Sequence, residues 1–256
     1  MKDNIYFVIP AYNEVENLPY LLKSLSRMGR FFDLTPVIVV VDDASTDGTI
    51  SVVEFYQRDM DISVIRHNQN LGPGAAFKTG FSHLLSHLTD NDIVVTIEAD
   101  NTSDLCIIGK MVELVNRDYD VVLANVYGPG RIIGASFIRR FISFWSNLLM
   151  KLVFRINGVD TYTSFFRAYS GASLRRLFAV YGQDAITEKG FTCMLEILVK
   201  FNLLGMRFGQ VPMLLDSKIR IGESKMKVVK NIKATLALMS RYLFLRQYRP
   251  SPKYKN

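Results

Sequence analysis

The chain has 256 residues, of which 49% are hydrophobic and 21% charged, so it can bury a large core and is not a disordered protein. Its two cysteines, Cys106 and Cys193, form neither a disulfide framework nor a zinc pattern, which favours a reducing compartment. The chain reaches a strand-like run by Ile5 without a leader, and no stretch offers the roughly 20 apolar residues of a spanning helix. We therefore expect a cytoplasmic protein.

The net charge of +7 is concentrated at the C-terminal end. From Lys218 onward the chain carries 11 Lys and Arg residues and one acidic residue, Glu223, whereas the first 217 residues carry 20 basic and 23 acidic groups. A basic segment at one place predicts a local anionic partner, such as phosphate groups, anionic lipid or nucleic acid.

Strand-like and helix-like segments alternate through the first half of the chain. Apolar, mostly β-branched runs occupy residues 5–9, 37–41, 62–66, 93–97 and 121–124, and helical patterns begin near Val15, Thr49, Gly74 and Asp104. This alternation predicts an α/β fold with a mainly parallel sheet flanked by helices. We expect one large domain over residues 1–220, followed by a basic amphipathic segment over residues 221–256.

Polar side chains follow three of these predicted strands. The fourth run ends in Glu98 and Asp100, the first in the segment 10–14, and the second in Asp42 and Asp43. The carboxyl ends of parallel strands share one edge of a sheet, where ligands bind. Asp43 could accept hydrogen bonds from a base or a ribose, whereas Asp47 or Thr49 more plausibly caps the next helix.

Glu98 and Asp100 are candidate ligands of a Mg²⁺ or Mn²⁺ ion that also holds phosphates, since alternate carboxylates after a strand supply hard oxygen atoms. A helix cap or a solvated loop is the alternative for this pair. The glycine-containing loop over residues 68–76 predicts a tight turn into a helix, and it lacks the spacing of a dinucleotide fingerprint or a P-loop.

Four motifs in this order resemble the nucleotide-binding half of family 2 glycosyltransferases: IPAYNE (9–14), VVDDASTDGT (40–49), NQNLGPGAAFKTG (68–80) and EAD (98–100). The resemblance implies a GT-A fold that binds a nucleoside diphosphate sugar, with the EAD motif holding the divalent cation. The positions that it assigns to the nucleotide pocket are Pro10, Tyr12, Glu14, Val41, Asp43 and Asp100.

The second half is similar to dolichyl-phosphate mannose synthases and their bacterial polyprenyl-phosphate relatives. The similarity rests on Arg140, Ser143, Asn147 and the segment 162–169, then on segments 190–196, 211–212 and 220–225. It implies a polyprenyl phosphate acceptor. It also implies that Arg220 and Lys225, with Arg140 as a further candidate, supply cations for the donor and acceptor phosphates.

The chain departs from the family pattern at several site positions. Glu98 and Thr102 stand where the metal motif usually has Asp and Gln, so the expected metal set is Glu98, Asp100 and Thr102. The usual Gly-Ser-Arg reads Ala124-Asn125-Val126, which leaves Arg131 or Arg139 as a substitute for the missing arginine. Thr161 and Phe165 replace a usual Asp and Gly.

Two amphipathic helices are predicted in the second half. Residues 137–154 place Phe137, Phe141, Phe144, Trp145, Leu148, Leu149 and Leu152 on one face. We expect that face to pack in the core, with a membrane-interface helix as the alternative. A second pattern over residues 228–243 lies among lysines and arginines and favours an anionic membrane surface, unless it is a solvated face of a packed helix.

The leading hypothesis is an inverting, metal-dependent glycosyltransferase at the cytoplasmic face of a membrane. A phosphate acceptor needs no general base, which agrees with the absence of an obvious catalytic histidine. A saccharide hydroxyl acceptor would need one, and Glu188 or Glu196 would be the first candidates. A degenerate scaffold subunit is a third hypothesis, and no nucleic-acid partner is expected because no recognised module accompanies the basic segment.

Overall fold

The computed structural model describes residues 4–31, 36–222 and 228–245. Its strands are β1 (Ile5–Ala11), β2 (Val37–Asp42), β3 (Ile62–Arg66), β4 (Ile93–Thr96), β5 (Val121–Asn125), β6 (Arg131–Ile133), β7 (Arg167–Ser170), β8 (Phe208–Pro212) and β9 (Leu214–Asp216). Its α-helices are α1 (Leu18–Phe31), α2 (Thr49–Tyr56), α3 (Pro73–Leu84), α4 (Ile108–Val115), α5 (Phe137–Phe154), α6 (Gly171–Tyr181), α7 (Cys193–Leu203) and α8 (Val228–Leu245), with short 3₁₀ turns η1 (Leu105–Ile107) and η2 (Gly182–Ala185).

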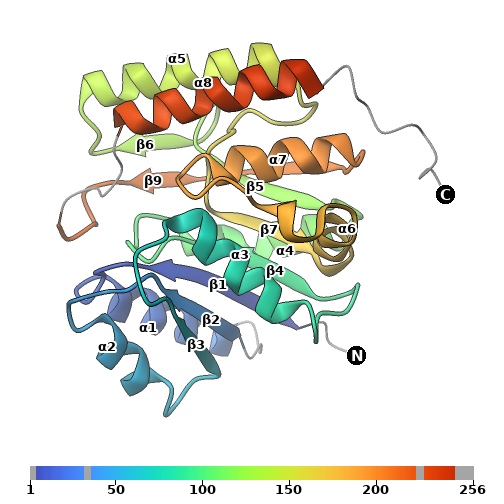
Figure 1. Cartoon of the computed structure of the whole chain (residues 1–256). Helices are drawn as coiled ribbons and strands as arrows, with labels where there is room; N and C mark the ends of the chain where they lie inside the picture. Colours follow the sequence, from blue (N-terminus) through green and yellow to red (C-terminus); the bar gives the residue numbers. More distant parts are fainter. Residues whose placement is uncertain (1–3, 32–35, 223–227, 246–256) are drawn as a thin grey trace.

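Seven strands form one sheet in the order β3-β2-β1-β4-β7-β5-β8 (Figure 1). Every pairing in it is parallel except those of β7, which runs antiparallel between β4 and β5. A second, two-stranded sheet pairs β6 with β9. The five predicted strands and the mainly parallel sheet are therefore confirmed.

Helices cover both faces of the large sheet, and each face has its own hydrophobic core. Side chains alternate between the two along each strand, as Phe7 and Ile9 of β1 face the α1, α2 and α4 side while Tyr6 and Val8 face α3, α6 and α7. This period of two explains why the strands read as unbroken apolar runs, since both faces are buried.

The polar motifs after β1, β2 and β4 meet at one edge of the sheet. β1 pairs in parallel with both β2 and β4, so the three carboxyl ends point the same way. A residue with a left-handed backbone follows each strand: Asn13 (φ 53°), Ala44 (φ 63°) and Asn101 (φ 61°). Side chains other than glycine adopt this conformation at a cost, and such positions cluster where a site requires a particular turn.

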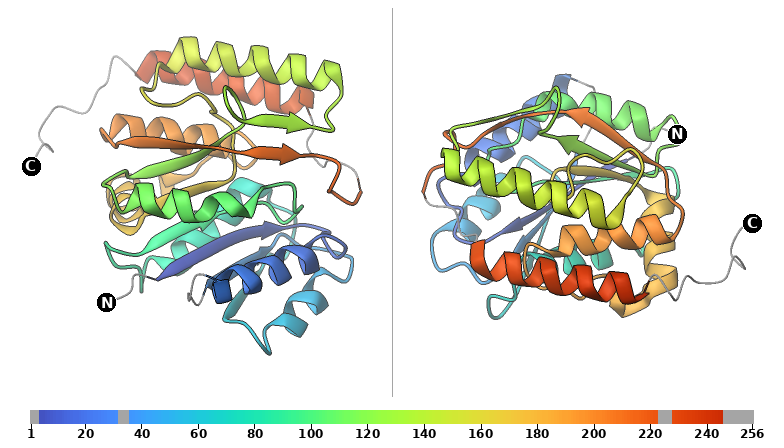
Figure 2. Two further views of the ribbon diagram at one scale, coloured as in Figure 1. Left: turned by 180° about the vertical axis from the view of Figure 1, so that it is seen from behind. Right: turned by 90° about the horizontal axis from the view of Figure 1, so that it is seen from above.

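Helices α5 and α8 lie side by side as a layer beyond the β6–β9 sheet and α7 (Figure 2). The ring of Phe154 at the end of α5 meets that of Tyr242 at a centroid distance of 4.8 Å. The expectation that the aromatic face of α5 packs in the core is wrong, because Phe137, Phe141, Phe144, Trp145, Leu149 and Leu152 are exposed.

The opposite face of α5 turns inward, including part of its polar side. Asn147 is buried, donates to the Asp160 carbonyl (2.5 Å) and accepts the Tyr162 amide (3.2 Å). Ser143 meets the Tyr127 hydroxyl at 2.8 Å, and Met150 is buried. Specific polar partners thus decide which face of this helix packs.

Within the described ranges, no helix has the length and apolar character needed to cross a membrane.

Candidate active site

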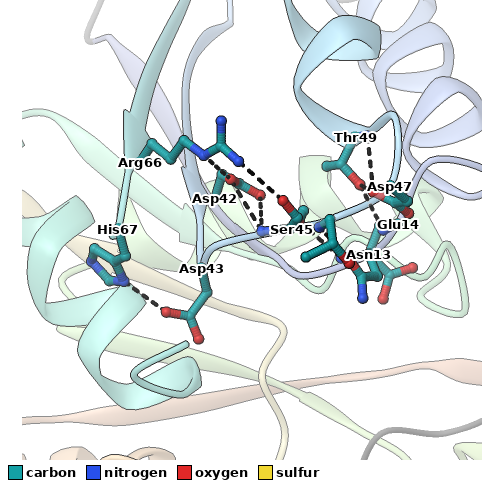
Figure 3. A network of polar contacts seen from close by, with 10 residues as sticks. Asn13, Glu14, Asp42, Asp43, Ser45, Asp47, Thr49, Arg66 and His67 are labelled. Carbon is teal, nitrogen blue, oxygen red and sulfur yellow. Dashed lines mark hydrogen bonds and ion pairs between the residues drawn. The ribbon is translucent and has the colours of Figure 1, made fainter. Parts of the chain in front are cut away.

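The turn after β1 is fixed by hydrogen bonds to the turn after β2 (Figure 3). The Asn13 amide donates to Ser45 Oγ (2.9 Å), and the Asn13 side-chain oxygen accepts the Thr46 amide (2.8 Å). The Glu14 amide donates to Thr49 Oγ1 (2.9 Å). Asp47 accepts the Thr49 amide (2.9 Å) and the Val15 amide (3.2 Å), although the N-cap position of α2, predicted at Asp47 or Thr49, is Gly48. These contacts hold Tyr12 and Glu14, both half-buried, at the sheet edge just after Pro10, which lies opposite the buried Val41 in the β1–β2 pair.

Asp43 organises the glycine-containing loop that precedes α3. Its Oδ1 accepts the Leu71 amide (2.9 Å) and contacts His67 Nδ1 (2.7 Å), while its Oδ2 accepts the Gly72 amide (2.7 Å). His67 in turn meets Thr79 Oγ1 at 2.9 Å. A carboxylate has about four acceptor positions, and among the described residues Oδ2 of the buried Asp43 has a single hydrogen-bond donor.

Two glycines let this loop approach the segment before α7. Gly72 has φ 91°, and a Cβ atom on it or on Gly74 would collide with the carbonyl groups of Lys189 and Glu188. The Gly74 amide donates to the Lys189 carbonyl (2.9 Å). The loop over 68–72 is thus held between Asp43 and residues 188–190, and Glu188 lies behind it.

Asp100 is buried at the carboxyl end of β4, at the centre of the polar edge. Its Oδ1 accepts the Thr102 amide (3.1 Å) and the Thr102 hydroxyl (2.8 Å). Its Oδ2 is buried and, within the described ranges, faces the Arg220 guanidinium as an ion pair rather than in a hydrogen bond of ordinary geometry. The predicted grouping of Asp100 with Arg220, 120 residues further on, is present. Thr102 orients Asp100.

Glu98 lies two residues before Asp100 and is half-buried. Burial raises the pKa of its carboxyl group, the positive charge of Arg220 opposes that shift, and Glu14 adds to it. A cation placed between Glu98 and Asp100 would favour the charged form of Glu98.

Arg220 belongs to a short segment that Asn17 holds in place. Asn17 Nδ2 donates to the Ile221 carbonyl (3.0 Å) and to Glu14 Oε2 (2.8 Å), and Asn17 Oδ1 accepts the Ile221 amide (2.9 Å). The sequence reasoning missed Asn17. Its one signal is its place three residues after Glu14, the last residue of the first motif.

The two candidate general bases have structural partners. Glu196 is buried and accepts the Thr187 amide (2.9 Å), the Glu188 amide (2.8 Å), the Thr187 hydroxyl (2.5 Å) and Lys200 Nζ (2.6 Å). Glu188 accepts the Thr192 hydroxyl (3.0 Å) and forms an ion pair with Arg241 of α8. All the acceptor positions of Glu196 are therefore used within the fold.

The other basic residues predicted for the site are exposed or lie outside the described residues. Arg140 is exposed in the first turn of α5, and Arg131 is exposed on β6. Lys225 and the side chain of Arg139 lie outside the described residues.

Two residues that differ from the family pattern, Thr161 and Asn125, contact each other. The Thr161 hydroxyl donates to Asn125 Oδ1 (2.7 Å). Asn125 Oδ1 also accepts the Tyr127 amide (2.9 Å).

This sheet order, with carboxylates where β4 ends, defines a GT-A fold. The structure resembles glucosyl-3-phosphoglycerate synthase from Mycobacterium tuberculosis in complex with Mn²⁺, uridine diphosphate and glucosyl-3-phosphoglycerate. The TM-score is 0.63 at 19% sequence identity, over 98% of this chain and 82% of the other. The Mg²⁺ and uridine diphosphate complex of the same enzyme gives a TM-score of 0.63 at 20% identity, over 93% and 79% of the two chains.

The chain belongs to glycosyl transferase family 2, whose model matches residues 6–179. It is 30% identical over 223 residues to undecaprenyl-phosphate mannosyltransferase of Micrococcus luteus, covering 86% of each chain. It is 27% identical over 224 residues to polyprenol monophosphomannose synthase of Mycolicibacterium smegmatis, covering 86% of this chain and 79% of the relative. These matches confirm the family resemblance expected from the motifs.

Proposed function

We propose that this glycosyltransferase moves a sugar from a nucleoside diphosphate sugar to a polyprenyl phosphate at a membrane surface, with inversion at the anomeric carbon. The observation that carries the proposal is the meeting of Asp100, Glu98 and Arg220 at the carboxyl edge of the sheet. The two relatives, named for undecaprenyl-phosphate and polyprenol substrates, support this class of acceptor.

The nucleotide half of the donor is assigned to the turns after β1 and β2. Pro10, Tyr12 and Glu14 line this pocket beside Val41. Asp43 contacts the nucleoside through the acceptor position left on Oδ2, because its other positions hold the loop over 68–72. The complexes of the M. tuberculosis synthase with uridine diphosphate support a nucleotide at this edge of the fold.

A Mg²⁺ or Mn²⁺ ion fits the donor set that Glu98 and Asp100 provide. The described residues contain no group of three or more His, Cys, Asp and Glu side chains suited to a metal. Mg²⁺ needs fewer, because one or two carboxylates and the substrate phosphates commonly hold it. The buried Oδ2 of Asp100 already faces a cationic group, and Thr102 supports the set by orienting Asp100. The ion supplies Lewis-acid stabilisation of the departing diphosphate.

The reaction needs charge stabilisation more than proton transfer. An oxygen of the acceptor phosphate forms a bond to the anomeric carbon while the bond from that carbon to the diphosphate oxygen breaks, so the nucleoside diphosphate leaves with the electron pair. The guanidinium of Arg220 stabilises that leaving group, and Lys225 and Arg140 are assigned to the phosphates. The occupied oxygens of Glu196 agree with an acceptor that carries its own negative charge.

Attachment to an anionic membrane surface, at its cytoplasmic face, is the last part of the proposal. The exposed aromatic face of α5 and the exposed Ile232 and Leu236 of α8 lie on neighbouring helices. The residues from Lys218 onward add a net charge of +10. An apolar helix face flanked by cations is the usual composition of a helix that lies in a membrane interface.

The test is transfer of labelled sugar to extracted polyprenyl phosphate with Mn²⁺ or Mg²⁺, over a panel of donors. Asp100→Ala should lose transfer by at least about 100-fold, equivalent to about 3 kcal/mol, because it removes the buried carboxylate that faces the cation. Asp104→Ala is the matched control, because Asp104 caps η1 four residues further on and should keep near wild-type rates.

Wild-type rates in the folded Asp100→Ala protein would overturn the metal assignment. Label that reaches only a saccharide hydroxyl would replace the proposed acceptor. Calorimetry that finds no metal-dependent binding of any nucleotide would favour the scaffold alternative.

A further inference from the structure

The segment that carries Arg220 has little hydrophobic support of its own. Lys218, Ile219, Ile221 and Gly222 are all exposed. At its start the Ser217 amide donates to the Ile133 carbonyl (3.0 Å), and the Lys218 amide donates to Asp216 Oδ1 (2.9 Å). At its other end the Ile221 backbone is paired with Asn17. The position of Arg220 therefore depends on polar contacts on either side of it.

Asn17 is suited to hold this segment rigidly. Its side chain is 4% exposed, and it pairs with both backbone groups of one residue, as a neighbouring strand would. A buried carboxamide that loses such partners leaves unsatisfied polar groups, so the contact is costly to break. Asn17 directly precedes α1, where asparagine commonly caps the helix. Here its oxygen accepts an amide 204 residues away instead.

We propose that Asn17 is a positioning residue that seats Arg220 against Asp100. The same Nδ2 also donates to Glu14 Oε2, so one side chain joins the nucleotide turn after β1 to the segment carrying Arg220. In this role Asn17 acts through Arg220 and not on the substrate directly. The inference rests on the proposed function, because Arg220 acts there on the departing diphosphate.

Gln210 of β8 offers a matched control. Its carboxamide makes the same kind of clamp, accepting the Asp160 amide (3.0 Å) and donating to the Gly158 carbonyl (2.6 Å) at the far edge of the sheet. Asn17→Asp and Gln210→Glu each keep the acceptor and remove the donor. Asn17→Asp also sets a carboxylate against the Ile221 carbonyl and Glu14. The two variants therefore make the same chemical change, and only one of them touches the Arg220 segment.

The first measurement is native-state cleavage by trypsin after Arg220, followed by mass spectrometry. Asn17→Asp should speed cleavage of the Arg220–Ile221 bond about tenfold or more, because the Ile221 backbone is released, whereas Gln210→Glu should leave it unchanged. This readout needs no enzyme activity. Unchanged cleavage in a folded Asn17→Asp protein would overturn the proposal.

The second measurement is a double-mutant cycle on Mn²⁺-dependent affinity for nucleoside diphosphates and on kcat/KM. Asn17→Asp should reduce both about tenfold in the wild-type background and by clearly less in the Arg220→Ala background, where only its contact with Glu14 remains. Equal effects in both backgrounds would overturn action through Arg220. If polyprenyl phosphate accepts no sugar, the proposed function fails, and the cleavage and affinity measurements still decide the role of Asn17.

Discussion

Glu196 shows how the partners of a single residue bear on a role that its type alone leaves open. A carboxylate near the acceptor end of a glycosyltransferase is a natural candidate for a general base. The structure gives it four donors, including Lys200, which is itself mostly buried. Its charge therefore holds the turn over residues 187–188 to α7.

We predict that Glu196→Gln lowers stability without removing a catalytic base. The amide cannot accept all four donors, and it leaves the Lys200 charge without its partner, so the free energy of unfolding should fall by about 3 kcal/mol. At a temperature where the variant is folded, kcat should stay near the wild-type value and the basic limb of the pH profile should persist, as measured by chemical denaturation and pH–rate curves.

Glu188→Gln is the companion variant. Among the described residues Glu188 does not accept such a set of backbone donors, so its replacement should lower the free energy of unfolding by less. A stable Glu196→Gln protein with turnover reduced by orders of magnitude would instead identify a base, and a hydroxyl acceptor would become the better interpretation.

Residues that differ from the family pattern can be explained by their side-chain contacts. Asn125 and Thr161 both differ from the pattern, and their side chains share a buried hydrogen bond. The two changed positions are therefore in direct contact in the fold. Thr102 likewise keeps a function, because its hydroxyl and its amide both support Asp100.

At the scale of elements, α5 packs with Asn147, Met150 and Phe154 inward and leaves its aromatic side exposed, Phe137 being 81% exposed. Neighbouring aromatic rings such as those of Phe141 and Trp145, tilted against each other with centroids 6.0 Å apart, continue that face along the helix. An exposed apolar patch of this kind marks an interaction site.

We predict that Phe141→Asp weakens binding to anionic vesicles about tenfold. The variant lacks the ring that would enter the membrane interface and places a negative charge there instead. Trp145 is the one tryptophan of the chain and lies on the same face, so its emission should shift to shorter wavelength when vesicles are added. Titration of that shift measures the affinity.

Phe55→Asp is the control, because Phe55 is 60% exposed on α2 at the other end of the molecule (Figure 1). Equal losses in the two variants would mean that α5 has no special part in membrane binding.

At the scale of the whole molecule, α8 is part of the folded structure. Leu238, Met239 and Tyr242 are buried, and Arg241 pairs with Glu188 near the site. Ending the chain after Lys227 would therefore remove the buried contacts of α8 together with its positive charge. The residues from 246 onward lie outside the described ranges and carry four cations, Arg246, Arg249, Lys253 and Lys255. The division of the chain at residue 220 stays a prediction.

We predict that ending the chain after Leu245 weakens binding to anionic vesicles while leaving stability unchanged. Each cation near an anionic surface contributes on the order of 1 kcal/mol, and the remaining affinity should depend less on salt. Vesicle sedimentation at two salt concentrations, with thermal melting as the check on folding, measures both effects. Binding that keeps its full strength and salt dependence would place the electrostatic attraction elsewhere.

Local sequence determined the five strands β1 to β5, the starts of α2 and α3 to within one residue, and the family. A strand buried on both faces is apolar along its length, and β1, β2, β4 and β5 follow this pattern up to the polar residues that end three of them, Asp42, Thr96 and Asn125. The bounds of α5 follow equally from its own pattern. The motifs after β1, β2 and β4 share one edge because parallel strands align their ends.

The tertiary structure alone decided which distant segments meet. No periodicity shows that β7 enters antiparallel between β4 and β5, or that α5 turns its polar side inward. The pairing of Asn17 with Ile221 depends on where β9 delivers the chain 204 residues later. A side chain chooses its partner from the groups that folding brings near it. Periodicity therefore predicted the elements, and the site required their arrangement.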